Sequence, residues 1–268
     1  MIGWLRASAV LVVVALVTPS LALLQLLAVR TGWFDERVLP SLWHRFILRM
    51  LGMRLHLHGR MSERRPLLLA SNHVSWTDIM VLGSAARVNF IAKAEVAGWP
   101  GIGILAHLQR TVFVERERRR KSGEQAVEIA GRMRRGDPMV LFPEGSTGDG
   151  NSLLPFKSTL FGAASMAIGD ASGETVVIQP VAIAYTRFHG MPMGRRHQMR
   201  AAWIGDTGLM PHLLALIREG AMDVEVHFGE PVEYDPGSGR KHAAREVERR
   251  VRAMFTAALR DPSSAKRG

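Results

Sequence analysis

A long uncharged segment near the start of the chain limits how this protein can fold. Residues 7–29 contain no Asp, Glu, Lys or Arg and consist mostly of Val, Leu and Ala. A membrane-crossing helix needs roughly 20 such residues, so we expect this segment to enter a bilayer. Pro19 should kink the helix or turn it into a re-entrant hairpin. A signal peptide cleaved after Ala22 is the alternative, although the apolar run continues beyond that residue.

Positive charge is concentrated on one side of this segment. Arg6 precedes it alone, whereas six arginines follow it: Arg30, Arg37, Arg45, Arg49, Arg54 and Arg60. This asymmetry predicts that the rest of the chain faces the cytoplasm, attached to the inner (cytoplasmic) membrane. The net charge of +11 favours anionic partners, namely nucleic acid, acidic lipid head groups or an acidic carrier protein. Cysteine is absent, which excludes thiolate metal sites and a cysteine nucleophile.

A second element, over residues 41–53, has the pattern of a basic amphipathic helix, and Gly52 is its expected stop. In a soluble protein its apolar face would pack on a core, but beside an apolar anchor we expect it to lie in the membrane interface. The sequence thus divides into a membrane anchor with an amphipathic helix over residues 1–54, a catalytic-sized domain over 55–262 and a disordered tail over 263–268.

The body of the chain alternates short apolar runs with longer helical patterns, which predicts an α/β fold with crossover connections. The expected strands cover residues 67–71, 88–92, 111–115, 139–142, 175–183, 199–204 and 223–228. The expected helices cover residues 77–84, 121–135, 158–168, 211–218 and 241–259.

Three polar clusters directly follow predicted strands: Asn72-His73, Glu115-Arg116 and Glu144. Ligands of open α/β sheets bind outside the carboxyl ends of the strands. If these strands are parallel neighbours, the three clusters converge on one edge of the sheet. This edge is therefore the expected functional site.

The first cluster pairs a histidine with an aspartate five residues later, His73 and Asp78. An imidazole can act as general base toward a hydroxyl, and a carboxylate bonded to Nδ1–H would fix its tautomer. A structural interpretation competes with this one, because Ser75-x-x-Asp78 is also a helix capping box. Both roles are compatible, since a helix that begins at Ser75 would present Asp78 to the preceding loop.

The other two clusters offer anion-binding groups. Arg116 at a strand end could fork onto a phosphate or carboxylate, although it also begins a charged run typical of a solvated helix face. The turn Pro143-Glu144-Gly145-Ser146 should expose backbone N–H groups that suit an anion or a developing oxyanion.

Taken together and in this order, these blocks resemble the signature of the glycerolipid acyltransferase family, which includes lysophosphatidic acid acyltransferases. The resemblance extends roughly over residues 60–232 and rests on four blocks: Asn72-His73-Val74-Ser75-Trp76-Thr77-Asp78, Phe113-Val114-Glu115-Arg116, Phe142-Pro143-Glu144-Gly145, and an apolar block over residues 176–181 that contains Pro180. It implies a mostly parallel sheet flanked by helices behind an N-terminal membrane-anchoring helical segment.

The resemblance also implies a reaction and roles for individual residues. His73 would be the general base and Asp78 its orienting partner, and the acceptor would contact Arg116, Glu144, Gly145 and Ser146. The acceptor hydroxyl would attack an acyl thioester, supplied by acyl-CoA or acyl carrier protein, with membrane lipid as acceptor. Neither a metal nor any cofactor beyond this thioester co-substrate is implied.

The third block departs from the family pattern in a way that bears on the acceptor. It continues Ser146-Thr147-Gly148-Asp149, so the arginine expected at position 147, a natural phosphate contact, is missing. Such loops are similar to those of family members that acylate lyso-ornithine lipid. Two acceptors therefore stay open: 1-acylglycerol-3-phosphate, placed first as the commoner activity, and lyso-ornithine lipid.

Two further possibilities come from the residues themselves. A non-enzymatic basic module that binds nucleic acid or anionic membrane has enough charge, but no stacking-type aromatic motif accompanies the basic runs, so we expect no nucleic-acid partner. His56 and His58 alternate with leucines and should line the polar side of a strand. We expect no metal there because no third ligand follows at metal-site spacing.

Overall fold

A computed structural model of the chain describes residues 2–115, 119–167, 175–205, 207–234 and 239–262. Its strands form one sheet with the order β1-β8-β6-β2-β5-β3-β4, and two short strands, β7 and β9, also pair with β6. The strands are β1 (Met53–His58), β2 (Leu67–Ser71), β3 (Asn89–Lys93), β4 (Val112–Val114), β5 (Met139–Leu141), β6 (Val176–Phe188), β7 (Met191–Pro192), β8 (Met222–Phe228) and β9 (Val232–Tyr234).

The sheet is mixed but mostly parallel, as expected. Strand β2 runs parallel to both β5 and β6, and β3 runs parallel to β4 and β5. The exception is the other end, where β8 and β1 are parallel to each other but β8 is antiparallel to β6. The carboxyl ends of β2, β4 and β5 therefore lie on one edge of the sheet, where the three polar clusters are predicted to converge.

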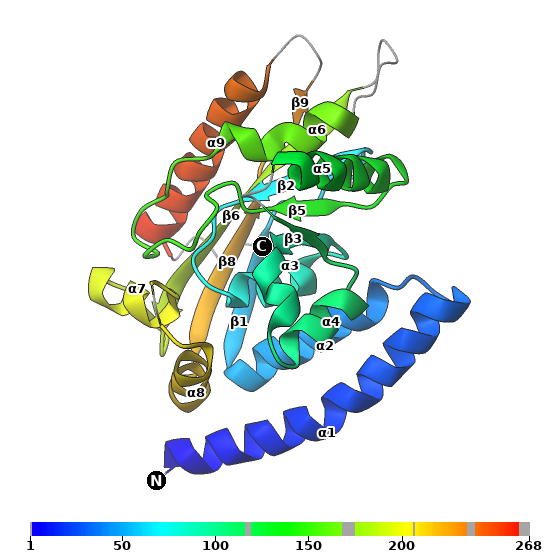
Figure 1. Ribbon diagram of the computed structural model, residues 1–268. Helices are drawn as coiled ribbons and strands as arrows, with labels where there is room; N and C mark the ends of the chain where they lie inside the picture. Colours follow the sequence, from blue (N-terminus) through cyan, green and yellow to red (C-terminus); the bar gives the residue numbers. More distant parts are fainter. Residues whose placement is uncertain (1, 116–118, 168–174, 206, 235–238, 263–268) are drawn as a thin grey trace.

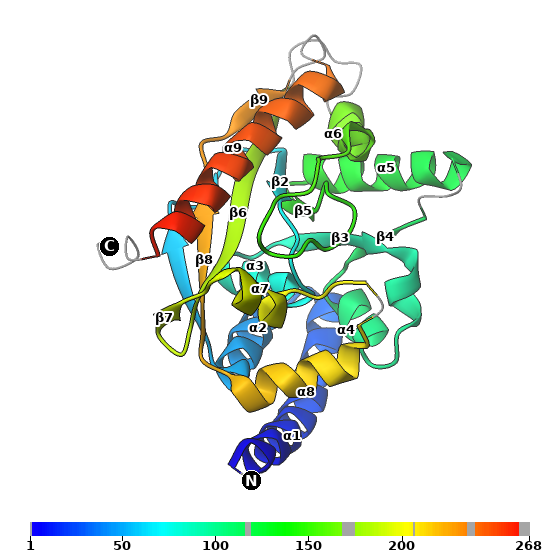
Figure 2. The ribbon, with the colours of Figure 1, turned by 90° about the vertical axis from the view of Figure 1, so that its left-hand side faces the viewer.

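Helices cover both faces of the sheet (Figure 1). The sheet therefore separates two hydrophobic cores, one on each face. Side chains of a strand point alternately to its two faces. In β6, Ile178 and Ala182 accordingly face the first core, and Val177 and Val181 face the second. The first face carries α5 (Arg119–Arg134), α6 (Gly162–Ala167) and α9 (Arg240–Arg260), and Figure 2 shows α9 lying along β6. The second carries α2 (Val38–Leu51), α3 (Thr77–Ala85) and α8 (Leu209–Glu219).

One further helix, α1 (Ile2–Thr31), runs along the outside of the second face, in contact with α2, α4 (Ile102–Leu108) and α8 (Figure 1). It continues through Pro19, so a re-entrant hairpin at that residue is wrong. The side chain of Gln25 is buried and donates hydrogen bonds to the carbonyls of Glu36 and Leu108. Gln25 thus faces the protein, whereas Leu16, Leu23 and several other large apolar side chains of α1 face outward.

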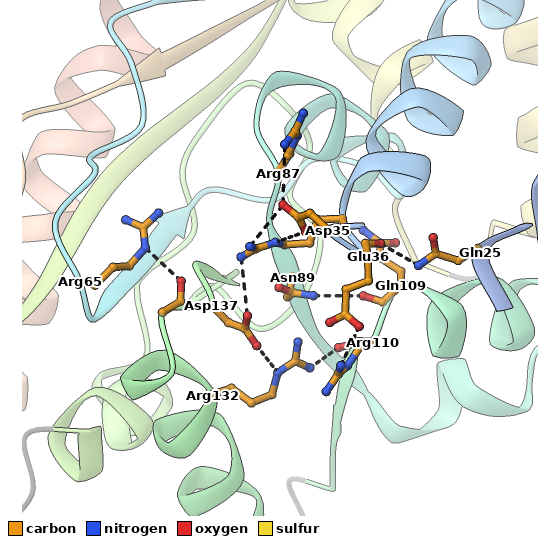
Figure 3. Close-up of polar contacts among 12 residues, drawn as sticks. Gln25, Asp35, Glu36, Arg65, Arg87, Asn89, Gln109, Arg110, Arg132 and Asp137 are labelled. Atoms are coloured by element: carbon orange, nitrogen blue, oxygen red, sulfur yellow. Dashed lines mark hydrogen bonds and ion pairs between the residues drawn. The ribbon is translucent and has the colours of Figure 1, made fainter. Parts of the chain in front are cut away.

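The loop between α1 and α2 is tied to the domain by ion pairs (Figure 3). Asp35 binds Arg37 at 2.9 Å and approaches Arg87 at 3.7 Å, and Arg37 in turn lies 3.6 Å from Asp137. On the neighbouring residue, Glu36 accepts a hydrogen bond from Arg110 at 2.7 Å. A network of several charges holds a loop better than isolated surface pairs do, so α1 and α2 are fixed as a unit against the domain.

Helix α2 matches our expectation in part. It ends at Gly52, which has the left-handed φ of 74° as predicted. Its apolar residues Ile47, Leu48 and Leu51, however, are buried in the second core, and the helix packs on α3. This burial agrees with the core-facing alternative, and the predicted position of the helix in the membrane interface stays a prediction.

Most of the other predicted elements are confirmed with small shifts. The helix predicted over 158–168 begins as the 3₁₀ turn η2 (Ser158–Phe161), continues as α6 and has its last residue outside the described residues, and β6 runs five residues beyond the predicted strand. One predicted element is wrong. The sequence predicts a strand over residues 199–204, but the chain forms helix α7 (Arg195–Ala201) there. A short apolar run does not distinguish strand from helix, and here the buried Gln198 of the helix donates to the carbonyl of Tyr185. Helix α4 is not predicted, since glycines usually break helices, yet Gly103 allows it to pack against the carbonyl of Ala97 in the preceding 3₁₀ turn η1 (Ala94–Gly98).

Candidate active site

The loop that follows β2 is locked onto the neighbouring strand before it reaches the histidine. Asn72 is buried and forms two hydrogen bonds with the backbone of Ile183 in β6, donating at 2.9 Å and accepting at 2.8 Å. Its side chain therefore acts as one more rung of the sheet. This explains an asparagine in front of the histidine and fixes the position of His73.

His73 and Asp78 meet as the sequence predicts. Nδ1 of His73 lies 2.9 Å from Oδ2 of Asp78, which is completely buried. A carboxylate accepts hydrogen bonds, so Nδ1 carries the proton and Nε2 is left as the basic nitrogen. The imidazole is stacked on the ring of Phe142, at 4.0 Å between ring centroids, and keeps part of its surface exposed to the cavity.

Asp78 also organises the backbone around it. Its Oδ2 atom accepts hydrogen bonds from the amides of Val74 at 2.6 Å and Ser75 at 2.9 Å. The bond to Ser75 has the form of the carboxylate half of a capping box, although α3 begins at Thr77 with Trp76 at its N-cap, and the Ser75 hydroxyl accepts from the amide of Thr77. The structural and the catalytic interpretations of Asp78 are therefore compatible, because one oxygen serves both contacts.

Glu144 lies behind His73 rather than in front of it. Its Oε1 atom accepts a hydrogen bond from the amide of His73 at 3.1 Å, and its Oε2 atom accepts one from the amide of Leu154 at 3.3 Å. Burial raises the pKa of Glu144 to about 8. Both oxygens are engaged by backbone, so the structure gives Glu144 a supporting position in place of the expected contact with the acceptor.

The turn after Glu144 does reach the cavity. Gly145 has a φ of +80°, which favours glycine, and its amide donates to the carbonyl of Phe142. Gly145, Ser146 and Thr147 line the same cavity as His73. The remaining predicted acceptor residue, Arg116, lies outside the described residues.

The cavity in front of His73 has a volume of about 930 Å³, near the upper end of the roughly 300–1,000 Å³ of ligand sites. It extends from the catalytic edge of the sheet to the outer helices, because Val10 and Val14 of α1 also line it. Most of its walls are apolar or aromatic, including Trp76, Trp99 and Trp203. Such a cavity suits a hydrocarbon chain whose reactive end lies at His73.

A second cluster of ionisable side chains lies on β1 and β8. The Nε2 atoms of His58 and His227 each lie 3.3 Å from Oε2 of the buried Glu225, and the three groups are close enough to surround an ion. The two imidazoles are stacked, with 4.1 Å between centroids and 8° between planes. Parallel rings do not direct both lone pairs at one ion, so a metal would require a ring rotation. Local spacing could not reveal this cluster, because the register of β1 against β8 brings His58 and His227 together. The absence of a functional metal stays a prediction.

Comparisons with known proteins agree with this geometry. The family model named Acyltransferase matches residues 54–184. The chain is 48% identical to the lyso-ornithine lipid O-acyltransferase of Rhizobium meliloti over 100% of its own length and 92% of that protein. It is 52% identical to the enzyme of the same name from Brucella abortus, over 97% of each chain. This chain belongs to the glycerolipid acyltransferase family.

Within the family, this acyltransferase groups with the relatives named for lyso-ornithine lipid. The 1-acyl-sn-glycerol-3-phosphate acyltransferase of Neisseria gonorrhoeae is more distant, at 29% identity over 73% of this chain and 72% of that protein. The crystal structure of the 1-acyl-sn-glycerophosphate acyltransferase PlsC from Thermotoga maritima has the same fold, with a TM-score of 0.65 and 19% identity over 96% of this chain and 94% of that one. The protein is thus a lysolipid O-acyltransferase, and the interpretation as a non-enzymatic basic module is wrong.

Proposed function

We propose that this acyltransferase esterifies the free hydroxyl of lyso-ornithine lipid with a fatty acyl group from a thioester donor. The observation that carries the chemistry is the His73–Asp78 pair at 2.9 Å, at the end of an apolar cavity of about 930 Å³. The acceptor follows from the near full-length similarity to two enzymes of that name.

The reaction proceeds by direct transfer. Nε2 of His73 takes the proton of the acceptor hydroxyl while its oxygen attacks the thioester carbonyl. Asp78 stabilises the imidazolium that forms. The tetrahedral intermediate collapses by breaking its C–S bond, and the imidazolium returns the proton to the departing thiolate. The products are the ester and the free thiol of coenzyme A or acyl carrier protein.

The developing oxyanion needs a donor near the turn after β5. The amide of Gly145 is used within the turn and that of Gly148 donates to the carbonyl of His73. In the described part of the chain, the amides of Ser146 and Thr147 have no backbone acceptor, and both residues line the cavity. These two amides are the best placed to stabilise negative charge on the carbonyl oxygen.

The missing arginine at position 147 supports lyso-ornithine lipid, whose head group is a zwitterionic amino acid, over a lipid with a phosphate head group. The Thr147 hydroxyl donates to the carbonyl of Trp203, so it is committed to holding the turn. The first-ranked acceptor of the sequence interpretation, 1-acylglycerol-3-phosphate, becomes the second candidate, favoured by its wider use in the family and by the more distant relatives.

The protein acts at the inner membrane with its catalytic domain on the cytoplasmic side. One helix among the described residues, Gly3–Thr31, is long and apolar enough to cross a membrane. Its inner face is bonded to the domain through Thr18 and Gln25, which favours an anchor over a cleaved signal peptide. The arginine-rich flank after this helix supports a cytoplasmic position of the domain.

One assay tests both the chemistry and the acceptor. Protein purified in detergent is given lyso-ornithine lipid or 1-acylglycerol-3-phosphate, each with acyl-CoA or acyl carrier protein loaded with the same chain. We expect faster transfer to lyso-ornithine lipid, and a loss of at least about 10³-fold in His73→Ala. The exposed His242 of α9 offers a matched control, since His242→Ala should keep full activity. Faster acylation of the phosphate lipid would reverse the choice of acceptor, and a tenth of wild-type activity in His73→Ala would reject the general base.

A further inference from the structure

The catalytic aspartate has a second oxygen that the histidine does not use. Oδ1 of Asp78 accepts a hydrogen bond of 2.7 Å from the hydroxyl of Tyr185, on β6. Tyr185 is 1% exposed and belongs to the second core. The two residues are 107 positions apart in the chain, so only the fold brings them together.

The direction of the hydrogen bonds around Tyr185 follows from its neighbours. The Tyr185 oxygen lies 2.6 Å from the Thr77 hydroxyl. Because a carboxylate can only accept, the phenol proton points to Asp78 and the Thr77 hydroxyl donates to the phenol oxygen. Burial, together with the Asp78 carboxylate, raises the pKa of the Tyr185 phenol well above its ordinary value. The phenol therefore stays a donor throughout the pH range of an activity assay.

The backbone of β6 holds the phenol in this place. Asn72 binds both backbone groups of Ile183, and Gln198 donates to the carbonyl of Tyr185 at 2.8 Å. The residues that fix Tyr185 thus come from the loop before the histidine and from helix α7. A ring held in this way keeps the carboxylate from rotating away from the imidazole.

We propose that Tyr185 is a positioning residue for acyl transfer, which fixes the Asp78 carboxylate and moderates its basicity toward His73. This inference rests on the proposed function, with His73 as the general base. It extends the His73–Asp78 pair to a chain of four groups in which Thr77 donates to Tyr185, Tyr185 donates to Asp78, and His73 donates to the other oxygen of Asp78.

The Tyr185→Phe variant separates this role from packing. It keeps the buried ring and removes only the hydroxyl, which leaves Oδ1 of Asp78 without its phenol donor. A hydrogen bond to a charged group is worth enough for kcat to fall about 10- to 100-fold. The KM for the acceptor should stay within about twofold, since Tyr185 is absent from the cavity lining.

The pH dependence of kcat/KM distinguishes this role from a purely structural one, because loss of packing alone would not shift its acidic limb. Without the phenol, the Asp78 carboxylate is more basic and stabilises the imidazolium of His73 more strongly. The acidic limb of kcat/KM should therefore move to higher pH by about half a pH unit or more.

The other ionisable groups near the His73–Asp78 pair are the same in the wild type and in Tyr185→Phe. Glu144 lies behind His73, with Arg252 of α9 near it, and Lys93 and Glu95 line the cavity from β3 and the turn after it. His212 of α8 binds the Trp76 indole. The difference between the two profiles therefore reports the loss of the phenol.

The chain offers a matched control, because it contains only two tyrosines. Tyr234 is also buried, at 3% exposure, and its hydroxyl lies 2.7 Å from the hydroxyl of Ser165, in the first core. Tyr234→Phe removes a comparable phenol hydrogen bond away from the catalytic pair. We expect kcat and the acidic limb to match the wild type.

If Tyr185→Phe folds poorly, a second measurement tests the same role of the phenol without removing it. In the Tyr234→Phe background, incorporation of 3-fluorotyrosine and then 3,5-difluorotyrosine alters Tyr185 alone. Each fluorine makes the phenol a stronger donor and Asp78 less basic, so the acidic limb should move stepwise to lower pH. The proposal fails if the limb does not move in this series, or if Tyr185→Phe retains kcat within twofold with an unchanged profile. Full activity of His73→Ala would instead overturn the proposed function itself.

Discussion

At the scale of single residues, burial changes the pKa of Glu144, whose carboxyl lies next to the catalytic loop. Its carboxyl is buried behind His73, and burial raises its pKa from the ordinary 4.5 to about 8, although two backbone amides favour the ionised form. At neutral pH it is therefore mostly protonated in the folded protein and ionised in the unfolded chain. Folding and the state of the catalytic loop are thereby linked to pH.

The sign of that linkage gives a prediction. Between about pH 4.5 and 8 the folded chain binds more protons than the unfolded chain, so Glu144 contributes stability at low pH that is lost as the pH rises through 8. The side chain of Glu144→Gln cannot titrate. Its NH₂ group would face the backbone amide of His73 or of Leu154, so that two donors oppose each other. We expect the variant to be less stable by a few kcal/mol near pH 5 and the difference to shrink toward pH 9. Thermal unfolding in detergent across this range measures it, and a constant difference would contradict the linkage.

At the scale of elements, the contact between α2 and α3 depends on a glycine. Gly83 of α3 lies against the imidazole of His44 in α2, and a Cβ at this position would overlap the ring. His44 has little room to move, since it is buried and makes edge contacts with Trp43 and Phe90. Gly83 thus allows α2, and with it the loop to α1, to pack closely on the domain.

We predict that Gly83→Ala destabilises the protein by about 1–3 kcal/mol, as expected for an overpacked contact. Chemical denaturation in detergent measures this. Gly123 in α5 is a suitable comparison, because it is also helical but a Cβ added there would meet no described atom within 4 Å. Gly123→Ala should be neutral or more stable by about 0.5–1 kcal/mol. Equal effects of the two substitutions would show that helix propensity, rather than the contact with His44, decides the outcome.

At the scale of the whole molecule, α1 presents an apolar surface that the described part of the chain leaves uncovered. Leu16 is 69% exposed and Leu23 is 65% exposed, while Gln25 on the opposite side is buried. A soluble monomer rarely exposes so large an apolar surface. Hydrocarbon is the environment that fits this face, and Val10, Leu11 and Val14 of the same helix line the cavity in front of His73.

We predict that Leu16→Glu combined with Leu23→Glu reduces binding to vesicles of anionic phospholipid by at least about tenfold, since each buried leucine contributes roughly 1.5–3 kcal/mol. Thermal stability in detergent should change little. Gln25→Leu serves as the opposite control, because it should retain vesicle binding but lose about 1–3 kcal/mol of stability when two carbonyls lose their donor. Vesicle flotation decides between these outcomes, and unchanged flotation of the double variant would mean that α1 is not the membrane-binding surface.

Most of the strands and helices and the long apolar helix α1 follow from the sequence, because each depends on local periodicity. The His73–Asp78 pair follows from a spacing of five residues together with the family resemblance. The antiparallel joining of β8 to β6, the helix over 195–201 and the supporting position of Glu144 depend on contacts between distant segments, and no local pattern encodes them. The same holds for the burial of the apolar face of α2 against α3. Tyr185 shows the limit most clearly. In the sequence it is an ordinary strand tyrosine, and only the pairing of β2 with β6 places its hydroxyl on the second oxygen of Asp78.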